Sequence, residues 1–345
     1  LGTLLLLFSF LSGNFQLWHL YLVVFIQAIF AVFQGPAMSA SITMLVPDEQ
    51  RNRANALMQM AQPSAGLLAP AITGLIYGLV GVTGAIIIDL LTFLIAVTVV
   101  LRVRIPFPKS TDEGQALKGA LWKESISGFR YLWGRRPLLY TMLFVSLVNF
   151  LVAGTGVLST PYILSRTNHD EAALGVIVSI LNLGALVGGV LMGIWKGPKK
   201  RINIIMPSIA LLSLNLAFVG MSQTNLALAI TVFTFLIPVS FANAAFMALL
   251  QAKVAPDVQG RVFSVTQQLS MLLTPISFLL VGPLADNVFE PAVGAEGWSL
   301  VAPLVGTGEG AGMGLMFVIL GGAGFLVTLL TYANKNIRNV EELLP

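Results

Sequence analysis

The sequence predicts an all-α membrane protein whose helices form two bundles, as in two-bundle transporters. Of its 345 residues, 56% are hydrophobic and only 10% are charged, whereas a soluble domain carries roughly a quarter charged residues. Apolar segments of about 20 residues follow one another along the chain, each long enough to cross a hydrocarbon core of about 30 Å as a helix. These runs are continuous rather than alternating, which favours helices over a β-barrel.

The first apolar run, 1–12, is too short to span a bilayer by itself and does not begin with methionine. We therefore expect it to be the tail of a spanning helix whose start precedes this sequence. With it, about ten spans are expected. The others are 17–45, 55–79, 83–101, 138–162, 172–195, 202–221, 226–250, 262–284 and 312–332.

The basic residues predict how the spans are oriented. Alternate connections hold all but one of the 19 Lys and Arg residues, and only Arg166 falls on the other set. Because Lys and Arg are retained on the cytoplasmic side, we expect these connections and the C-terminus to be cytoplasmic. Ordinary solvated loop charges are compatible with the same pattern. The net charge of +4 then reflects topology, and no nucleic-acid partner is expected.

The longest polar break, 102–136, predicts a cytoplasmic linker and carries Pro106 and Pro108. It would separate an N-terminal bundle, 1–101, holding the last four helices of six, from a six-helix C-terminal bundle with its tail, 137–345. The linker also holds apolar residues at near-helical spacing, which favours an amphipathic helix on the membrane surface over a solvated linker. These are Leu117, Leu121, Phe129 and Leu132.

Two segments share one layout and suggest that the halves are repeats. Segments 46–78 and 254–286 each place Pro and Asp in a short polar loop, then an arginine at a helix start, then a long apolar span. Repeated halves of this kind are how many secondary carriers are built. Two equal bundles would give about twelve helices in the intact protein, of which about ten are present here.

The same residues argue against several classes of function. The chain has no cysteine, and His19 and His169 are far apart, so no metal site is expected. No phosphate-binding GxxxxGK[ST] loop and no catalytic constellation of carboxylates, histidines or nucleophiles is visible. We expect neither an enzyme nor a cofactor. A long Gly-rich segment before the last span carries Glu290, Glu296 and Glu309 and is expected to be a solvated loop.

The order and spacing of five segments resemble the major facilitator superfamily. They are VPDEQRNRANAL (46–57), IIIDLLTFLIAV (86–97), GIWKGPKKR (193–201), VAPDVQGRVFSV (254–265) and GMGLMFVILGG (312–322). Within the superfamily, the chain resembles bacterial drug and siderophore exporters of the macrolide efflux and enterobactin export type. The resemblance covers the whole chain, places its start in the third of twelve helices, and implies a monomer in the bacterial inner (plasma) membrane.

Two motifs of that superfamily are incomplete here. The resemblance assigns the exporters' glycine and proline motif of the fifth helix to Gly66, Ala69, Pro70 and Gly74. The second copy of the cytoplasmic loop motif lacks its usual aspartate. It corresponds to Gly193, Lys196, Gly197, Lys199, Lys200 and Arg201.

Two features of the spans predict a role in transport. Small or kink-permitting residues recur four apart along one face of the fifth helix, which suits close bundle contact and gating, or ordinary small-residue packing. They are Gly66, Pro70, Gly74 and Gly78. Asp89 is the only ionisable side chain expected inside a span, and such carboxylates mark proton or substrate pathways; a structural brace between helices is the alternative.

Two further groups lie at or near the ends of the spans. Asp48 paired with Arg53, and Asp257 paired with Arg261, are predicted to brace a closed cytoplasmic gate; plain anchoring at the interface is the alternative. Amides in or near the spans are predicted to line an uncharged substrate cavity, with interhelical hydrogen bonding as the alternative. They are Gln34, Asn149, Asn182, Asn243 and Gln267.

The function expected from this pattern is secondary active export of a small amphipathic molecule by alternating access, coupled to proton antiport. One charge moving through about 100 mV supplies roughly 2.3 kcal/mol, which is adequate for the cycle. The partners would be the lipid bilayer, protons and a substrate of the drug, macrolide or siderophore class. A lysophospholipid or lipid flippase of the same fold, and a transport-inactive membrane scaffold, are the alternatives.

Overall fold

The computed structural model describes residues 16–102, 129, 131–195 and 197–343, so the predictions for 1–12 and for nearly all of the linker lie outside it. Every regular element in these ranges is helical, which confirms the all-α fold. Seven of the described helical segments are long and apolar enough to cross a membrane.

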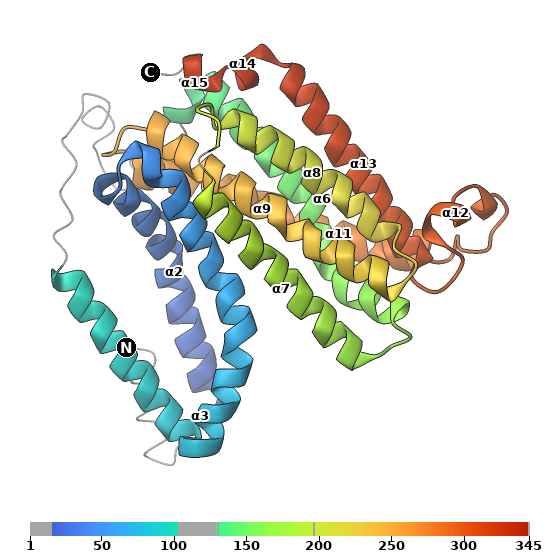
Figure 1. The fold of residues 1–345 in the computed structure, drawn as a ribbon, viewed down its shortest axis with the longest axis horizontal. Helices are drawn as coiled ribbons and strands as arrows, with labels where there is room; N and C mark the ends of the chain where they lie inside the picture. The colour runs from blue at the N-terminus through green and yellow to red at the C-terminus, as the bar shows by residue number, and fades with distance from the viewer. Residues whose placement is uncertain (1–15, 103–128, 130, 196, 344–345) are drawn as a thin grey trace.

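The first bundle consists of α2 (Leu17–Leu45) and α3 (Arg51–Arg102), joined by the short helical turn η1 (Asp48–Gln50). α3 holds two of the expected spans, because the chain reverses at Gly81 and the second arm, Thr83–Arg102, runs back (Figure 1). Gly81 has φ +66°, a left-handed conformation that glycine adopts at little cost. The break expected between 79 and 83 therefore lies at a residue suited to it.

The second bundle contains the remaining helices, and their ends agree with the expected spans to within a few residues. The expected span 262–284 forms a longer segment, Gln259–Phe289, because α10, α11 and the π-helical turn η2 (Ala285–Phe289) continue one another with an interruption at Leu273. The helices are α6 (Arg136–Arg166), α7 (Glu171–Ile194), α8 (Ile202–Gly220), α9 (Asn225–Lys253), α10 (Gln259–Leu272), α11 (Thr274–Leu284), α12 (Ala302–Val305), α13 (Ala311–Ala333), α14 (Lys335–Arg338) and α15 (Val340–Leu343).

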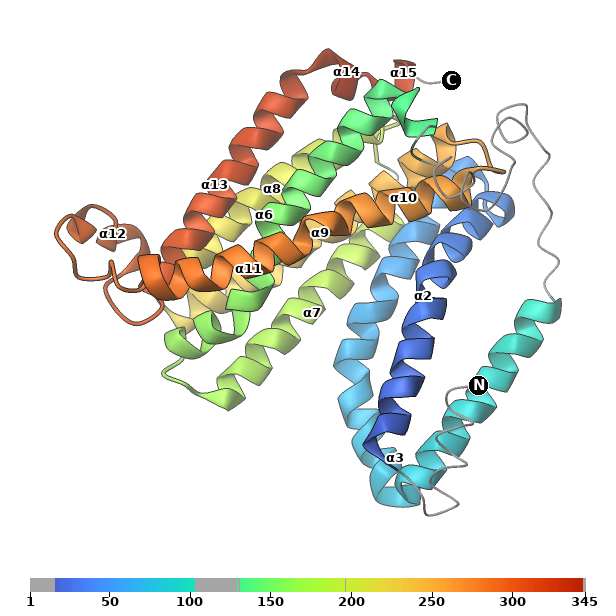
Figure 2. The same cartoon turned by 180° about the vertical axis from the view of Figure 1, so that it is seen from behind.

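The bundles meet at one end and diverge toward the other, as both views show (Figures 1 and 2). We call the meeting end the basic end, because the described connections and tail there carry nearly all of the described Lys and Arg residues. We call the opposite end the far end; it holds Gly81, the α6–α7 turn and the segment between α11 and α13.

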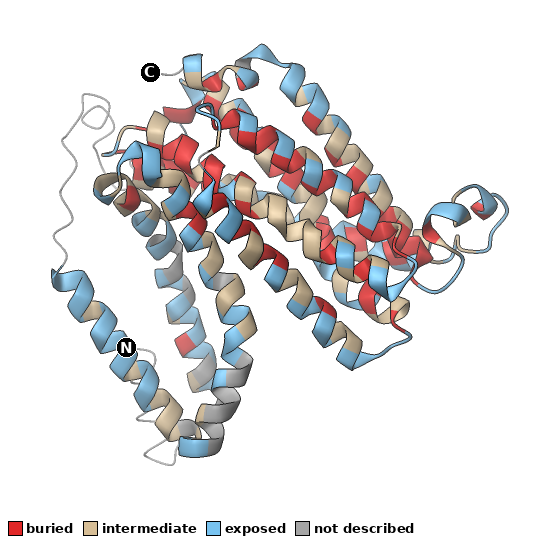
Figure 3. Cartoon of the chain, in the orientation of Figure 1, coloured by how far each residue is buried: buried red, intermediate tan, exposed pale blue. Residues whose placement is uncertain are grey.

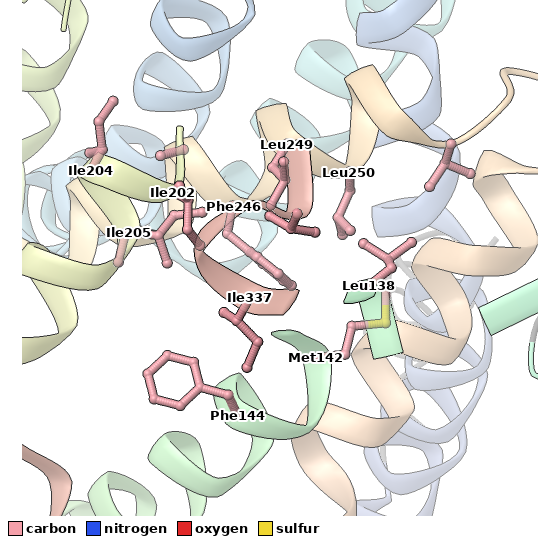
Figure 4. Close-up of a cluster of buried hydrophobic side chains, with 14 of the residues drawn as sticks. Leu138, Met142, Phe144, Ile202, Ile204, Ile205, Phe246, Leu249, Leu250 and Ile337 are labelled. Carbon is pink, nitrogen blue, oxygen red and sulfur yellow. The ribbon is translucent and has the colours of Figure 1, made fainter. Parts of the chain in front are cut away.

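Buried side chains concentrate in the second bundle (Figure 3). One apolar cluster lies near the basic end and joins Leu138 and Met142 of α6 to Ile205 of α8 and Leu249 of α9 (Figure 4). By contrast, the most apolar 18 residues of Thr83–Arg102 include no buried residue. Exposed leucine, isoleucine and phenylalanine side chains suit a helix whose solvent is lipid.

The segment between α11 and α13 is partly folded: Glu296 and Glu309 are exposed, as expected of a solvated loop, whereas Glu290 is not. The Glu290 carboxylate accepts hydrogen bonds from the backbone N–H groups of Met313 at 2.8 Å and Gly310 at 3.3 Å, capping the start of α13. Trp298 is 6% exposed and donates its indole N–H to the Gly306 carbonyl at 2.9 Å. The expectation was wrong for Glu290, because a capping carboxylate and a buried indole give this glycine-rich segment its own small core.

Candidate functional site

The candidate site is the junction between the bundles at the basic end. There α3 packs against α7 and α9, and α2 packs against α10. Because each of these contacts joins helices of different bundles, the bundles can separate here only by breaking them.

A buried amide pair lies at the centre of this junction. Asn55 of α3 donates from Nδ2 to Oε1 of Gln251 of α9 at 2.9 Å, and these residues are only 3% and 2% exposed. Gln251 donates in turn to the Ser39 carbonyl of α2 at 2.8 Å, so one side chain bonds both helices of the opposite bundle. We call Asn55 and Gln251 the amide latch. Buried amides without partners are costly, so the latch favours the closed junction strongly.

The carbonyl of Gln251 is bound as well. It accepts from Arg51 Nη1 at 3.2 Å, across the junction, and from Gln259 Nε2 at 3.0 Å, within its own bundle. Gln259 is fully buried and also donates to the Val254 carbonyl at 2.9 Å. The C-terminal end of α9 is thus held by contacts within its own bundle as well as by contacts with the other bundle.

Charged residues continue the junction toward the surface. Asp48 Oδ1 lies 3.0 Å from Arg51 Nη1, in its own bundle, and 2.8 Å from Arg201 Nη2, in the other bundle. We call Asp48, Arg51 and Arg201 the charge gate. Burial lowers the pKa of the Arg51 guanidinium, while Asp48 acts in the opposite direction. Through its two ion pairs, the Asp48 carboxylate links Arg51 of the first bundle to Arg201 of the second.

This geometry changes the predicted pairing of the gate. Asp48 contacts Arg51 and Arg201 rather than Arg53, which is exposed. The predicted pairing fails because of the helix register. Arg51 follows Asp48 by three residues and faces it, whereas Arg53 lies a further ~200° around the helix and points away. Asp257 and Arg261 lie in the α9–α10 turn and the first turn of α10, and their pairing with each other stays a prediction.

A cleft of ≈ 850 Å³ lies between η1 and the connection from α7 to α8. Its lining includes Asp48, Asn52 and Arg53 on one side and Trp195 and Arg201 on the other. Asp48 and Arg201 both line this cleft. The cleft has room for water, so their ion pair can break and re-form as the bundles move.

The glycine motif lies partly at the bundle contact. A methyl group added at Gly66 of α3 would lie 3.2 Å from the amide oxygen of Asn182 of α7, and one added at Gly189 of α7 would collide with the Met60 side chain of α3. Small residues thus permit the close approach of α3 and α7. The other residues that recur four apart along this helix are Pro70, Gly74 and Gly78, and their side-chain environments are not described by the structure.

The structure brings together two of the amides predicted to line one cavity. Asn149 of α6 and Asn243 of α9 line a cavity of ≈ 100 Å³ whose other walls are apolar and include Ile209 and Phe246. Asn182 lies instead at the α3–α7 contact. Gln34 and Gln267 are exposed on α2 and α10.

Asp89 lies within the second arm of α3 and is exposed. Its backbone carbonyl accepts from the Thr92 hydroxyl at 2.9 Å. Among the described residues its carboxylate makes no hydrogen bond or ion pair, so a structural brace is not seen there.

Sequence reasoning missed Arg51, Asn55 and Gln251. Asn55 was placed at the first position of an expected span, and Gln251 just after the end of another. The sequence feature that could have identified these three residues is that each is a polar side chain at the basic end of an apolar helix.

Comparison with known proteins identifies relatives over most of the chain. The sequence model of the Major Facilitator Superfamily matches residues 1–278. Macrolide efflux protein A of Streptococcus pyogenes is 28% identical over 303 residues, which are 87% of this chain and 73% of that protein. Macrolide efflux protein A of Enterococcus faecalis is 28% identical over 277 residues, 80% of this chain and 85% of that protein.

A further relative carries no substrate in its name. It is an uncharacterised MFS-type transporter of Bacillus subtilis, YkuC, 25% identical over 295 residues, which are 82% of this chain and 67% of that protein. The similarity therefore extends to transporters beyond those named for macrolide efflux.

Proposed function

Because this chain belongs to the major facilitator superfamily, as a multi-pass membrane protein with efflux proteins among its relatives, we propose that it exports small amphipathic molecules by alternating access. The observation that carries the proposal is the one-sided junction. The amide latch and the charge gate join the bundles at the basic end, while the bundles diverge toward the far end. An alternating-access carrier that is closed at one end and open at the other has this form.

The basic end is the cytoplasmic end in this proposal, and the C-terminus is cytoplasmic. Among the described residues, Arg166 is the only Lys or Arg at the far end, which follows the positive-inside rule. The structure then corresponds to the state closed toward the cytoplasm. The inward-open state requires that Asn55 separate from Gln251 and that Asp48 release Arg201.

The cavity of Asn149 and Asn243 supports the proposed substrate class, a small amphipathic molecule. Two amides among apolar walls suit the polar group of a solute whose remaining surface is apolar. The cavity volume of ≈ 100 Å³ accommodates only part of a drug-sized molecule, so the rest of the substrate would extend between the bundles. Relatives named for macrolide efflux support a drug, macrolide or siderophore class.

Proton antiport is the proposed energy source, with Asp89 as the coupling residue. A carboxylate inside an apolar span costs about 3 kcal/mol on insertion scales, and such residues mark proton or substrate pathways. Asp89 is exposed on the most apolar of the described spans. Its carboxylate has no ion-pair partner among the described residues, which favours proton coupling over a structural brace.

The test is uptake of labelled macrolide or siderophore into inverted vesicles, with and without a proton gradient. The proposal predicts accumulation that requires the gradient. Accumulation of equal size without a gradient excludes proton antiport. If no amphipathic compound accumulates, translocation of a labelled lysophospholipid in the same vesicles separates a flippase from an inactive scaffold.

A further inference from the structure

The C-terminal tail is part of the folded second bundle. In α14 and α15, Ile337 is 5% exposed and Val340 is fully buried, and both belong to the apolar cluster at the basic end. Figure 4 shows the labelled Ile337 among Phe144, Met142 and Phe246. The tail is therefore anchored beside the junction, with its backbone fixed.

This anchoring brings Glu341 of α15 to the start of α8. Its Oε2 atom accepts a hydrogen bond from the backbone N–H of Ile202 at 3.1 Å, and its Oε1 atom lies 3.8 Å from Arg201 Nη1. The side chains of Glu341 and Arg201 are each 11% exposed. A carboxylate at a helix N-terminus is further favoured by the helix dipole, so this contact is stable within the bundle.

Arg201 consequently lies between two carboxylates that behave differently as the transporter moves. Its Nη1 faces Glu341 in its own bundle, and its Nη2 donates to Asp48 in the other bundle at 2.8 Å. The first contact persists when the bundles separate, whereas the second must break. An arginine already held in one orientation loses less conformational freedom when it binds its second partner.

We propose that Glu341 is a positioning residue of the charge gate: the tail carboxylate holds the Arg201 guanidinium toward Asp48 and so sets how firmly the basic end closes. The inference rests on the proposed function only in taking closure of this end as half of the transport cycle.

The neighbouring residue offers a matched control. Glu342 is one position along the same helix and pairs with Lys200 Nζ at 2.5 Å, but both side chains are about half exposed. This hydrogen bond lowers the pKa of the Glu342 carboxyl. Lys200 forms no hydrogen bond or ion pair with the first bundle among the described residues, and its pair with Glu342 lies within the second bundle.

The experiment measures the opening of the basic end directly. The full chain has no cysteine, so nitroxide labels at introduced Gln50→Cys and Lys199→Cys report one distance, across the cleft. Both positions are exposed. The ratio of the long-distance to the short-distance population is measured in proteoliposomes without substrate. We expect Glu341→Gln to raise this ratio about fivefold or more, and Glu342→Gln to leave it within about twofold of the parent.

Two further variants separate positioning from a general structural role. Glu341→Asp keeps the charge and is expected to shift the ratio less than Glu341→Gln. In an Arg201→Gln background, Glu341→Gln is expected to have no further effect, because there is no guanidinium left to position. An unchanged ratio for Glu341→Gln overturns the proposal, and so does a shift of undiminished size in the Arg201→Gln background. Loss of transport with these distances as expected would count against the exporter proposal instead.

Discussion

Replacing Asn55 with leucine should open the basic end, because the amide latch is buried only while the bundles are joined. Leucine has the same branched arrangement of side-chain heavy atoms as asparagine, so the change removes the amide and keeps the general shape of the side chain. Gln251 Oε1 would lose the donor that now lies 2.9 Å away, while Gln251 Nε2 keeps the Ser39 carbonyl at 2.8 Å.

The expected size of the effect follows from this single unpaired atom. A buried polar group left without its partner costs about 1–3 kcal/mol. In the open state water can solvate Gln251, so the cost falls on the closed state alone. The open-to-closed ratio should therefore rise by about 5- to 150-fold.

The assay is the distance distribution between labels at Gln50→Cys and Lys199→Cys. Gln259→Met is the matched control, since Gln259 is equally buried but bonds only within its own bundle, to Gln251 and Val254. It should lower thermal stability without changing the ratio. An Asn55→Leu distribution identical to the parent, or an equal shift in Gln259→Met, would refute the role of the latch.

Three other outcomes are expected. Asn149→Leu and Asn243→Leu should each raise the KM for an amphipathic substrate at least several-fold in vesicle uptake, because each removes a polar group from the cavity; an unchanged KM would remove that amide from the site. Asp89→Asn should abolish gradient-driven uptake and leave substrate binding intact, and gradient-driven uptake at the parental rate would make Asp89 structural. Gly184→Ala should lower stability by about 1–3 kcal/mol, since the added methyl group would collide with α9 backbone, whereas Gly175→Ala, on the same helix with nothing within 4 Å, should not; equal melting temperatures for the two variants would contradict this packing.

The helices could be predicted from the sequence because each apolar run specifies its own span. The position of the reversal at Gly81 was also predicted, because this glycine lies in the gap between the expected spans 55–79 and 83–101. Its φ of +66° shows the conformation that this residue permits. The helical spans and the turn between them depend on residues that are close together in the sequence, so a local pattern is enough to predict them.

The junction could not be predicted in the same way, because its pairs join distant parts of the chain. Asn55 and Gln251 are separated by 196 positions, and no local pattern indicates that they meet. Choosing Arg51 over Arg53 as the partner of Asp48 required the helix register at the start of α3. Repeat symmetry suggested a gate at this loop but not the arginine that reaches it from the other bundle.

The C-terminal tail illustrates a third limit. No local pattern of the sequence indicates that Glu341 reaches α8, because the contact depends on the burial of Val340, which anchors α15 beside that helix. Glu290 was misread for the same reason, since its carboxylate caps α13 across more than a dozen residues. A charge in a polar segment acquires a role when the fold brings an unpaired donor to it.

The central claim is that closure alternates between the two ends of one molecule. Distances measured in the same proteoliposomes, at Gln50→Cys with Lys199→Cys for the basic end and at Leu79→Cys with Glu171→Cys for the far end, test it most directly. The account predicts that conditions that lengthen the first distance shorten the second. Two distances that lengthen together, or a far end that stays unchanged while the basic end opens, would contradict it.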